Sequence, residues 1–188
     1  NPALLSAITH VINHSSSLHL MGLIGQGNVH ASLNHLFALL RLTHDHHLNP
    51  FLHLFTDGRD SSPTSAPELI SQVESECQKL GTGQIATISG RYFAMDRDQR
   101  WDRTEAAYLA LTSGSPVTAL NALTAVNQAY QQGQTDEFIQ PTTIIPDGLI
   151  KDNDAVIFFN FRIDRPRQLT RAFTLPDFES INQPIATF

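Results

Sequence analysis

The sequence predicts an α/β fold in three layers, with a mainly parallel sheet between two layers of helices. Apolar runs of strand length occur at residues 18–24, 51–55 and 84–89, and each precedes a polar loop and a segment of helical periodicity. Three strand–loop–helix units in succession imply parallel strands joined by right-handed crossovers. The loops that follow the strands then share one edge of the sheet, which is where such folds bind ligands.

Local signals set most of the predicted boundaries. A helix over residues 2–13 is expected because Asn1 suits the N-cap and Pro2 the first turn. Gly81 is a natural C-cap for a helix over residues 65–80. The other predicted elements are a helix over 31–46, a helix from near Trp101, a helix over 117–132, a connection over 134–150 with a short strand at 142–145, a strand over 155–161, a helix over 165–173 and an extended tail from Leu175.

Composition excludes several classes of protein. With 188 residues, 41% hydrophobic and 16% charged, the chain should fold as a globular protein. Its net charge of -6 disfavours an arginine-rich nucleic-acid binder and an anionic-membrane binder, since both need a broad basic surface. No apolar run approaches the length of a membrane span, no signal-peptide pattern is present and Cys77 has no partner, so a cytoplasmic protein is expected.

Arginine is concentrated in the loops that are predicted to follow the strands. The chain has ten Arg but two Lys, and four arginines fall within the thirteen residues 91–103, directly after a predicted strand. The planar guanidinium group can grip a carboxylate or phosphate with two parallel hydrogen bonds, which the lysine ammonium group cannot do. The alternative is a solvated face on which these arginines pair with the nearby carboxylates of Asp96, Asp98, Asp102 and Glu105.

Four predicted strand-to-helix loops carry polar or charged side chains that should converge in one cleft. Five arginines in one cleft would repel one another unless an anion lay among them, so the convergence predicts an anionic ligand. The converging residues are His30, Arg59, Asp60, Arg91, Arg97, Arg162 and Arg165.

Two of these residues could move a proton. Asp60 is the one carboxylate predicted beside the cations, and a neighbouring arginine favours its ionised, proton-accepting form. The alternative for Asp60 is a loop-capping role before the next helix. His30 could orient a phosphate or shuttle a proton, and a hydrogen bond at the start of a helix is equally plausible for it.

Other residues that attract notice carry weaker signals. The run His44-Asp45-His46-His47 cannot direct all its side chains to one point on a helix, so an exposed helix end is favoured over a metal site. Cys77 is best explained as a small core residue. The loop Gly25-Gln26-Gly27 follows a strand as phosphate-binding loops do, but it matches no dinucleotide or P-loop fingerprint.

Taken together, these motifs resemble one family, the cofactor-independent (2,3-bisphosphoglycerate-independent) phosphoglycerate mutases. The matching stretches are Leu18 to His30, Asp57-Gly58-Arg59-Asp60, Ser89 to Asp98 with Arg100-Trp101, and Asn160 to Arg165 with Arg167 to Thr170. They cover most of the chain in the order typical of the family.

The resemblance implies that residues 1–188 are the inserted substrate-binding, or phosphotransferase, domain of a two-domain enzyme, with two subdomains of about 1–133 and 134–188 as a further option. The family's metal-binding, phosphatase-like domain would supply a serine nucleophile and two divalent metals, usually manganese. No motif of that domain occurs in this chain. The resemblance therefore implies no cofactor within this chain and no activity for this chain alone.

The resemblance also implies a reaction and a role for each site residue. The full-length enzyme, a cytoplasmic monomer, would interconvert 3-phosphoglycerate and 2-phosphoglycerate in glycolysis and gluconeogenesis through a phosphoserine on the other domain. Asp60 would carry the proton between the hydroxyl groups. By position in the motifs, the phosphoglycerate ligands would be His30, Arg59, Asp60, Arg91, Arg97, Arg162 and Arg165.

The chain departs from the family pattern in one loop. Where the family usually has Ser-Asp-Gly-Gly-Val-His, this chain has Gly25-Gln26-Gly27-Asn28-Val29-His30 and so lacks a carboxylate and a glycine. Asn28 tolerates the left-handed conformation that a glycine would supply, so the turn should survive. The same departure is the only support for an alternative, a stand-alone phosphometabolite-binding module without catalytic activity.

Overall fold

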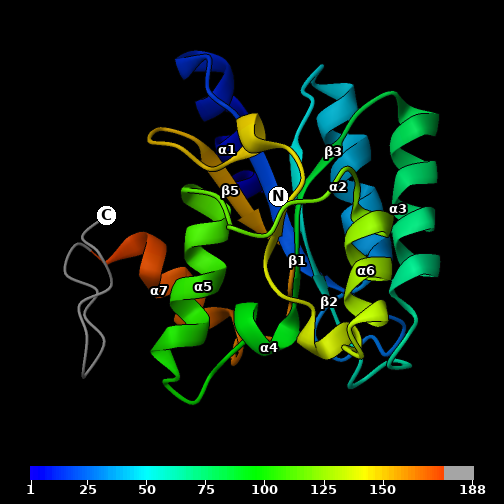
Figure 1. The fold of residues 1–188 in the computed structure, drawn as a ribbon. Coiled ribbons are helices and arrows are strands. Elements are labelled where there is room, and N and C mark those ends of the chain that lie inside the picture. The colour runs from blue at the N-terminus through cyan, green and yellow to red at the C-terminus, as the bar shows by residue number, and fades with distance from the viewer. Residues whose placement is uncertain (176–188) are drawn as a thin grey trace.

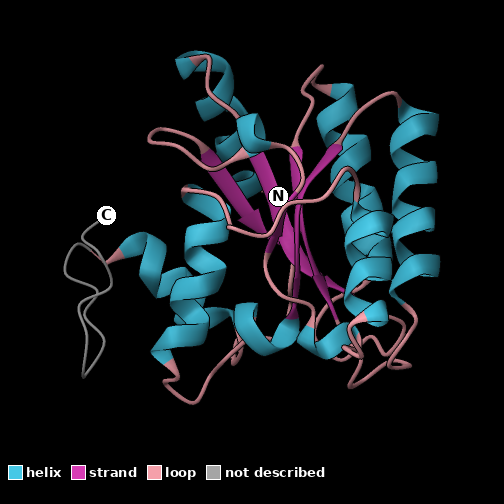
Figure 2. Cartoon of the chain, in the orientation of Figure 1, coloured by secondary structure: helices cyan, strands magenta, loops and turns pink. Residues whose placement is uncertain are grey.

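The computed structural model describes residues 1–175, which form a three-layer α/β/α fold around a five-stranded sheet (Figures 1 and 2). The strand order is β4-β3-β2-β1-β5, and β4 runs antiparallel to β3 while the other neighbouring pairs are parallel. This arrangement confirms the predicted fold class. The strands are β1 (Leu18–Ile24), β2 (Phe51–Thr56), β3 (Gln84–Gly90), β4 (Thr142–Thr143) and β5 (Ala155–Phe158).

Helices cover both faces of this sheet. One face carries α2 (Leu33–Asp45), α3 (Ala66–Leu80) and α6 (Ala122–Gln131), and the other carries α1 (Pro2–His14), α5 (Trp101–Thr112) and α7 (Pro166–Thr174) (Figure 1). Two short helical turns, α4 (Arg91–Ala94) and η1 (Asp136–Phe138), lie at the edge where β1, β2 and β3 end, whereas η2 (Pro146–Gly148) lies at the opposite edge (Figure 1).

The core lies on both faces of the three central strands. All seven residues of β1 are buried, which explains why this strand reads as a continuous apolar run rather than an alternating one. Leu20, Leu54 and Ile88 come from neighbouring strands and are fully buried, as are Leu36 and Leu69 from the covering helices. Burial of each such side chain contributes about 1.5–3 kcal/mol to folding.

Boundaries with a local cap are predicted well, and those set by distant residues are not. The side chain of Asn1 accepts a hydrogen bond from the backbone N–H of Ala3, as expected for an N-cap. The predicted helix over 117–132 is wrong at its start, because α6 begins at Ala122 with Asn121 as its cap. Residues 115–119 instead hydrogen-bond along the edge strand at Thr143.

The structure also differs from the prediction in the lengths of two strands and in the arginine loop. β5 ends at Phe158 rather than at residue 161, because the Asn160 side chain replaces the ladder by accepting from the backbone N–H of Leu23. The edge strand β4 has two residues instead of the four predicted. The arginine loop contains the one-turn helix α4, which is too short to produce a visible periodicity. Beyond Leu175, the predicted extended tail lies outside the described residues.

Residues after 134 contribute two strands, β4 and β5, to the same sheet as the first three strands. The division of the chain into two subdomains stays a prediction. No helix among residues 1–175 is long and apolar enough to cross a membrane.

Candidate functional site

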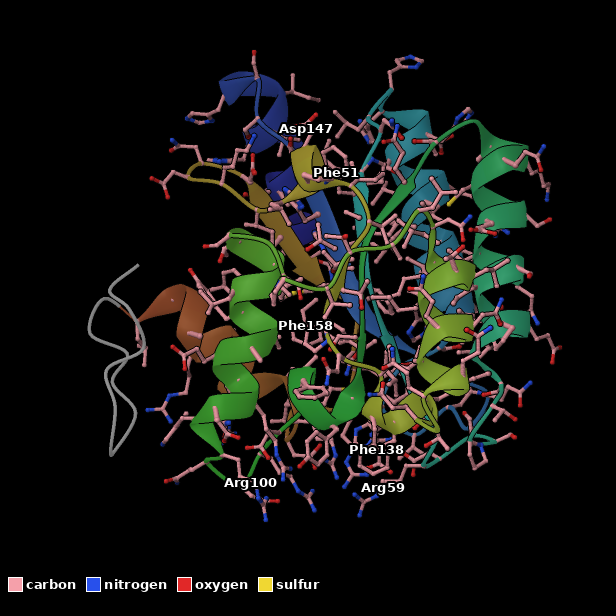
Figure 3. The ribbon with its side chains drawn as sticks, viewed as in Figure 1. Phe51, Arg59, Arg100, Phe138, Asp147 and Phe158 are labelled. Carbon is pink, nitrogen blue, oxygen red and sulfur yellow. The ribbon has the colours of Figure 1, made fainter. Side chains whose placement is uncertain are left out.

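The seven residues singled out by sequence lie in the four loops that follow β1, β2, β3 and β5, at the edge where these parallel strands end. Figure 3 shows Arg59 and Arg100 at this edge, on the side opposite Asp147 and Phe51. The topology therefore brings together loops that are up to 135 residues apart, from His30 to Arg165.

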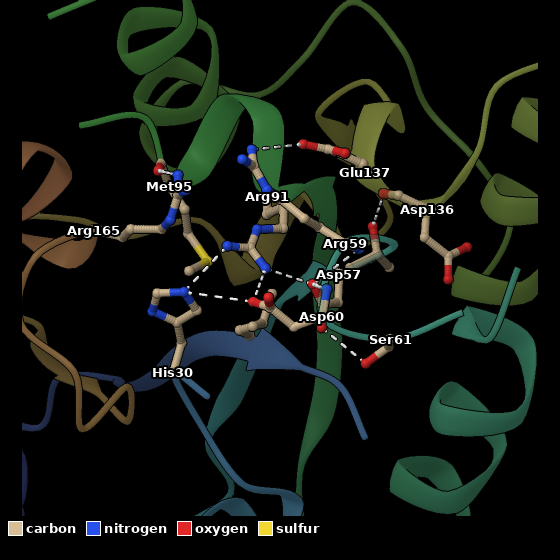
Figure 4. A network of polar contacts seen from close by, with 12 residues as sticks. His30, Asp57, Arg59, Asp60, Ser61, Arg91, Met95, Asp136, Glu137 and Arg165 are labelled. Atoms are coloured by element: carbon tan, nitrogen blue, oxygen red, sulfur yellow. Dashed lines mark hydrogen bonds and ion pairs between the residues drawn. The ribbon is translucent and has the colours of Figure 1, made fainter. Parts of the chain in front are cut away.

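An ionic cluster with Arg91, Asp57 and His30 buried and Asp60 partly exposed joins the loops after β1, β2 and β3 (Figure 4). The guanidinium group of Arg91 donates from Nη1 to Asp57 Oδ1 and to Asp60 Oδ2, each at 2.6 Å. Nη2 of Arg91 lies 3.2 Å from Nε2 of His30, which is also 3.5 Å from Asp60 Oδ2. Thus His30, Asp60 and Arg91 do come together, with Asp57 as a fourth member that was not predicted.

The contacts fix the protonation of the His30 ring. Because a guanidinium nitrogen can only donate, His30 Nε2 must accept from Arg91, and the ring proton then sits on Nδ1. Burial first, and the charge of Arg91 second, lower the pKa of His30 below 6.5. His30 is therefore suited to donate from Nδ1 as a neutral ring near pH 7.

The Arg97 and Arg162 side chains meet at a carboxylate that was also missed. Asp164 lies 2.7 Å from Nη1 of Arg97 through Oδ2 and 3.1 Å from Nε of Arg162 through Oδ1. Its Oδ1 atom is also 3.8 Å from Nδ1 of His30. Burial is the largest single influence on the pKa of Asp164 and raises it. The hydrogen bond from Arg97 and the charge of Arg162, together with smaller contributions, outweigh burial, so that the pKa is lowered.

Arg59 and Arg165 complete the set. Arg59 is exposed and lies 3.6 Å from Glu137, which comes from η1. Arg165 donates to the backbone carbonyl of Met95 at 3.1 Å and makes no ion pair within residues 1–175. Burial, and then the charges of the neighbouring arginines 91, 97 and 59, lower the pKa of Arg165. An anion beside Arg165 would offset the repulsion from these neighbouring arginines.

Two sequence-based interpretations need correction. Asp60 is not the one carboxylate beside the cations, since Asp57, Asp164 and Glu137 also contact site arginines. These three carboxylates offset much of the repulsion among the arginines. The clustering of the arginines therefore does not by itself require a bound anion, contrary to the expectation from the sequence.

Two arginines within residues 91–103 pair with nearby carboxylates, which was the alternative to a ligand-binding role. Arg100 pairs with Asp98 at 2.7 Å, and Arg103 lies 3.6 Å from Asp96. The guanidinium of Arg103 also stacks over the ring of Tyr92 at 3.6 Å. Neither arginine was among the predicted ligands.

The loop over residues 25–28 keeps its turn despite the departure from the family pattern. Asn28 has φ of 50°, the left-handed conformation that was expected of it. A side chain at Gly27 would bring its Cβ within 2.3 Å of the Asp60 carbonyl oxygen, so this position packs directly against the loop that carries Asp60. The loop over residues 25–28 is therefore in close contact with the loop that carries Asp60.

Comparison with known proteins gives this geometry its context. A family model described as "BPG-independent PGAM N-terminus" matches residues 1–188. The chain belongs to this family. The 2,3-bisphosphoglycerate-independent phosphoglycerate mutase 1 of Methanosarcina barkeri is 50% identical over 187 residues, which cover 96% of this chain and 36% of the relative.

Two further relatives agree with this membership. The 2,3-bisphosphoglycerate-independent phosphoglycerate mutase of Chloroflexus aurantiacus is 53% identical over 190 residues, covering 97% of this chain and 35% of the relative. A crystal structure of Leishmania mexicana phosphoglycerate mutase at low cobalt concentration superposes with a TM-score of 0.82 at 26% identity, covering 97% of this chain and 40% of that one. The chain spans little more than a third of the length of its curated relatives.

The described residues offer no evident metal centre. Within residues 1–175, no group of three or more His, Cys, Asp or Glu side chains is placed to hold a metal ion. His44, Asp45, His46 and His47 are all exposed at the end of α2, as the sequence indicated. Cys77 is partly buried against the core, and burial raises the pKa of its thiol to about 11.

A cavity of about 800 Å³ lies elsewhere, between α5, α7 and the turn that precedes β5. It is lined by residues such as Tyr108, Asp154 and Phe173 and contains none of the seven predicted site residues. The charged loop edge, rather than this cavity, brings together groups that could bind an anion and transfer a proton.

Proposed function

We propose that this chain is the substrate-binding part of a 2,3-bisphosphoglycerate-independent phosphoglycerate mutase, which interconverts 3-phosphoglycerate and 2-phosphoglycerate in glycolysis and gluconeogenesis. Family membership over residues 1–188 supports this proposal. The observation that carries it at the level of chemistry is the gathering of five arginines, His30 and Asp60 from four separate loops at one edge of the sheet.

The ligand suits this set of side chains. Phosphoglycerate has a carboxylate at one end and a phosphate at the other, and both match the planar donor fork of arginine. Arg165 and Arg59 are the site arginines with the weakest resident pairing, so they would gain most from the ligand. The remaining predicted ligands are His30, Asp60, Arg91, Arg97 and Arg162.

In this proposal, Asp60 carries the proton between the two glycerate hydroxyl groups. Its Oδ2 atom lies 2.6 Å from Arg91 Nη1, which leaves the second oxygen, Oδ1, to face a hydroxyl group. Preorganised charge of this kind accounts for most of the acceleration in phosphoryl transfer. Arg91 is buried, and its guanidinium group already donates to Asp57, Asp60 and His30. It would therefore act mainly by holding Asp60 and His30 in place.

The rest of the reaction requires groups that this chain does not supply. The serine that accepts the phosphoryl group and two divalent metals, manganese in the first instance, would belong to the remaining two thirds of the polypeptide. Full-length protein would act as a cytoplasmic monomer. The alternative, a non-catalytic phosphometabolite-binding module, would be favoured by a gene that ends without a metal-binding domain.

An assay of the full-length protein tests the proposal. Conversion of 3-phosphoglycerate to 2-phosphoglycerate is expected in the wild type, and Asp60→Asn should lower kcat by about a hundredfold or more, the range typical of a lost general acid–base group. Asp98→Asn, which removes an exposed carboxylate paired with Arg100, is the matched control and should retain kcat. No conversion by the wild type, or unchanged kcat in Asp60→Asn, would contradict the assignment.

A further inference from the structure

Asp164 occupies a central position among the predicted ligands although it is not one of them. Its carboxylate contacts Arg97 at 2.7 Å and Arg162 at 3.1 Å, and it faces Nδ1 of His30 at 3.8 Å. Three of the seven predicted ligand side chains therefore direct a donor toward this one carboxylate. Two cationic forks and one neutral N–H around an anion are also the contacts that a bound phosphate or carboxylate would need.

The contacts of Asp164 are of a kind that can exchange. Its side chain is 30% exposed, and those of Arg97 and Arg162 are 45% and 50% exposed. Ion pairs with this much solvent access are weak, typically below about 1 kcal/mol. In contrast, the Asp57–Arg91 pair is almost fully buried and is committed to the fold.

Two buried atoms at the same place have hydrogen-bonding capacity that residues 1–175 do not use. His30 Nδ1 carries the ring proton but makes no hydrogen bond, and Asp164 Oδ1 accepts none with good geometry. The two atoms face each other at 3.8 Å, which is too far for a hydrogen bond. An oxygen of another anion in place of Oδ1 could satisfy His30 more fully.

We propose that Asp164 is an internal competitor for anions at Arg97 and Arg162. By neutralising these two guanidinium groups, it keeps small free anions out of the site, and it yields to ligands that also engage Arg59 and Arg165. This role rests on the proposed function in taking phosphoglycerate as the ligand that displaces Asp164. Its physical basis, competition of one carboxylate with a free anion, is separate from catalysis.

The competitor role and a purely positioning role of Asp164 predict opposite changes in phosphate affinity when its charge is removed. If Asp164 competes, Asp164→Asn removes a negative charge a few ångströms from the anion, and binding of inorganic phosphate should become about three- to tenfold tighter. If Asp164 only holds Arg97 and Arg162 in place, the same variant should bind phosphate more weakly. Asp164→Glu keeps the charge and should bind phosphate within about twofold of the wild type.

The experiment is calorimetric titration of the full-length protein with inorganic phosphate and, separately, with 3-phosphoglycerate. Asp98→Asn makes the same change in net charge in the arginine loop, at a carboxylate that is 61% exposed, and should leave both affinities within about twofold. The gain in Asp164→Asn must disappear in the double variant Arg97→Gln with Asp164→Asn, which locates the extra phosphate at this pair.

The outcomes separate this inference from the proposed function. Tighter phosphate binding in Asp164→Asn that is lost in the double variant supports the competitor role, even in a protein that fails to interconvert phosphoglycerates. Equal or weaker phosphate binding in Asp164→Asn overturns it, although mutase activity of the wild type would still support the proposed function. Undetectable phosphate binding to both proteins, or a gain that survives in the double variant, overturns it as well.

Discussion

Asp57 and Arg91 form an ion pair of 2.6 Å whose side chains are 1% and 2% exposed. The pair joins the loop after β2 to the start of α4, and Asp57 also accepts hydrogen bonds from the backbone N–H of Asp60 and from the hydroxyl of Ser61. The loop that presents Asp60 is therefore held by a buried charge pair, which makes its geometry sensitive to either partner.

Loss of this pair should destabilise the fold. Asp57→Ala leaves the buried guanidinium of Arg91 with Asp60 as its one remaining carboxylate, and the free energy of unfolding should fall by about 3 kcal/mol, measured by urea denaturation. Asp98→Ala removes the exposed partner of Arg100 and should cost less than about 1 kcal/mol. Similar losses in the two variants would show that burial of the Asp57–Arg91 pair does not matter.

Stability should also decline in mild acid because three buried histidines, His19, His30 and His53, have a lowered pKa. His19 and His53 are hydrogen-bonded to each other at 2.9 Å, and burial lowers the pKa of both below 6.5. Below that pH the unfolded chain binds more protons than the folded one, so the free energy of unfolding falls by about 1.4 kcal/mol per pH unit for each histidine that stays neutral.

Urea denaturation between pH 7.5 and 5, at intervals of about half a unit, measures this slope. Burial raises the pKa of the Asp57 carboxyl, but its hydrogen bonds and Arg91 outweigh burial and lower the pKa, so this group stays ionised across the window. His46→Gln changes an exposed histidine and should leave the slope unaltered. A flat profile from pH 6.5 to 5 would contradict the assignment of neutral, buried rings.

A methyl group at Gly90 should disturb the site through the backbone. Its Cβ would lie 2.3 Å from the carbonyl oxygen of Glu137, so η1 and the start of α4 cannot keep their present separation. Gly90→Ala should cost about 2 kcal/mol or more and should lower ligand affinity, because Arg91 and Arg59 lie on either side of this contact. Gly81→Ala, with no atom near the new Cβ, is the control and should affect stability but not affinity.

The forked geometry of arginine should matter at Arg97. Arg97→Lys keeps the charge but loses the bidentate donor, so calorimetry should show weaker binding of 3-phosphoglycerate, by about tenfold. Arg100→Lys makes the same change at an arginine of similar exposure that pairs with Asp98 and should bind normally. Equal affinity of Arg97→Lys and the wild type would count against a forked contact at this position.

The sequence was sufficient where structure is determined locally. β1, β2 and β3 are fully or largely buried, so their apolar runs identified both the strands and the edge at which their loops meet. Helix α1 carries its own cap in Asn1. These features placed all seven predicted site residues at one edge, whereas their roles as phosphoglycerate ligands stay predictions.

What the sequence could not supply were pairings between distant residues. The start of α3 is fixed by Asp136, whose carboxylate accepts from the backbone N–H of Ala66, 70 residues earlier in the chain. Glu137 reaches Arg59 from the same distant turn. Asp57 and Asp164 stood within the matching motifs, but spacing along a loop does not reveal which cation a carboxylate contacts.

The central claim is that these particular arginines hold phosphoglycerate. An NMR titration of the Arg Nε–H signals of the full-length protein with 3-phosphoglycerate tests it most directly. The account predicts saturable shifts at Arg59, Arg91, Arg97, Arg162 and Arg165, with the signals of Arg41 and Arg103 unchanged. Shifts confined to other arginines, or none at millimolar ligand, would contradict the claim.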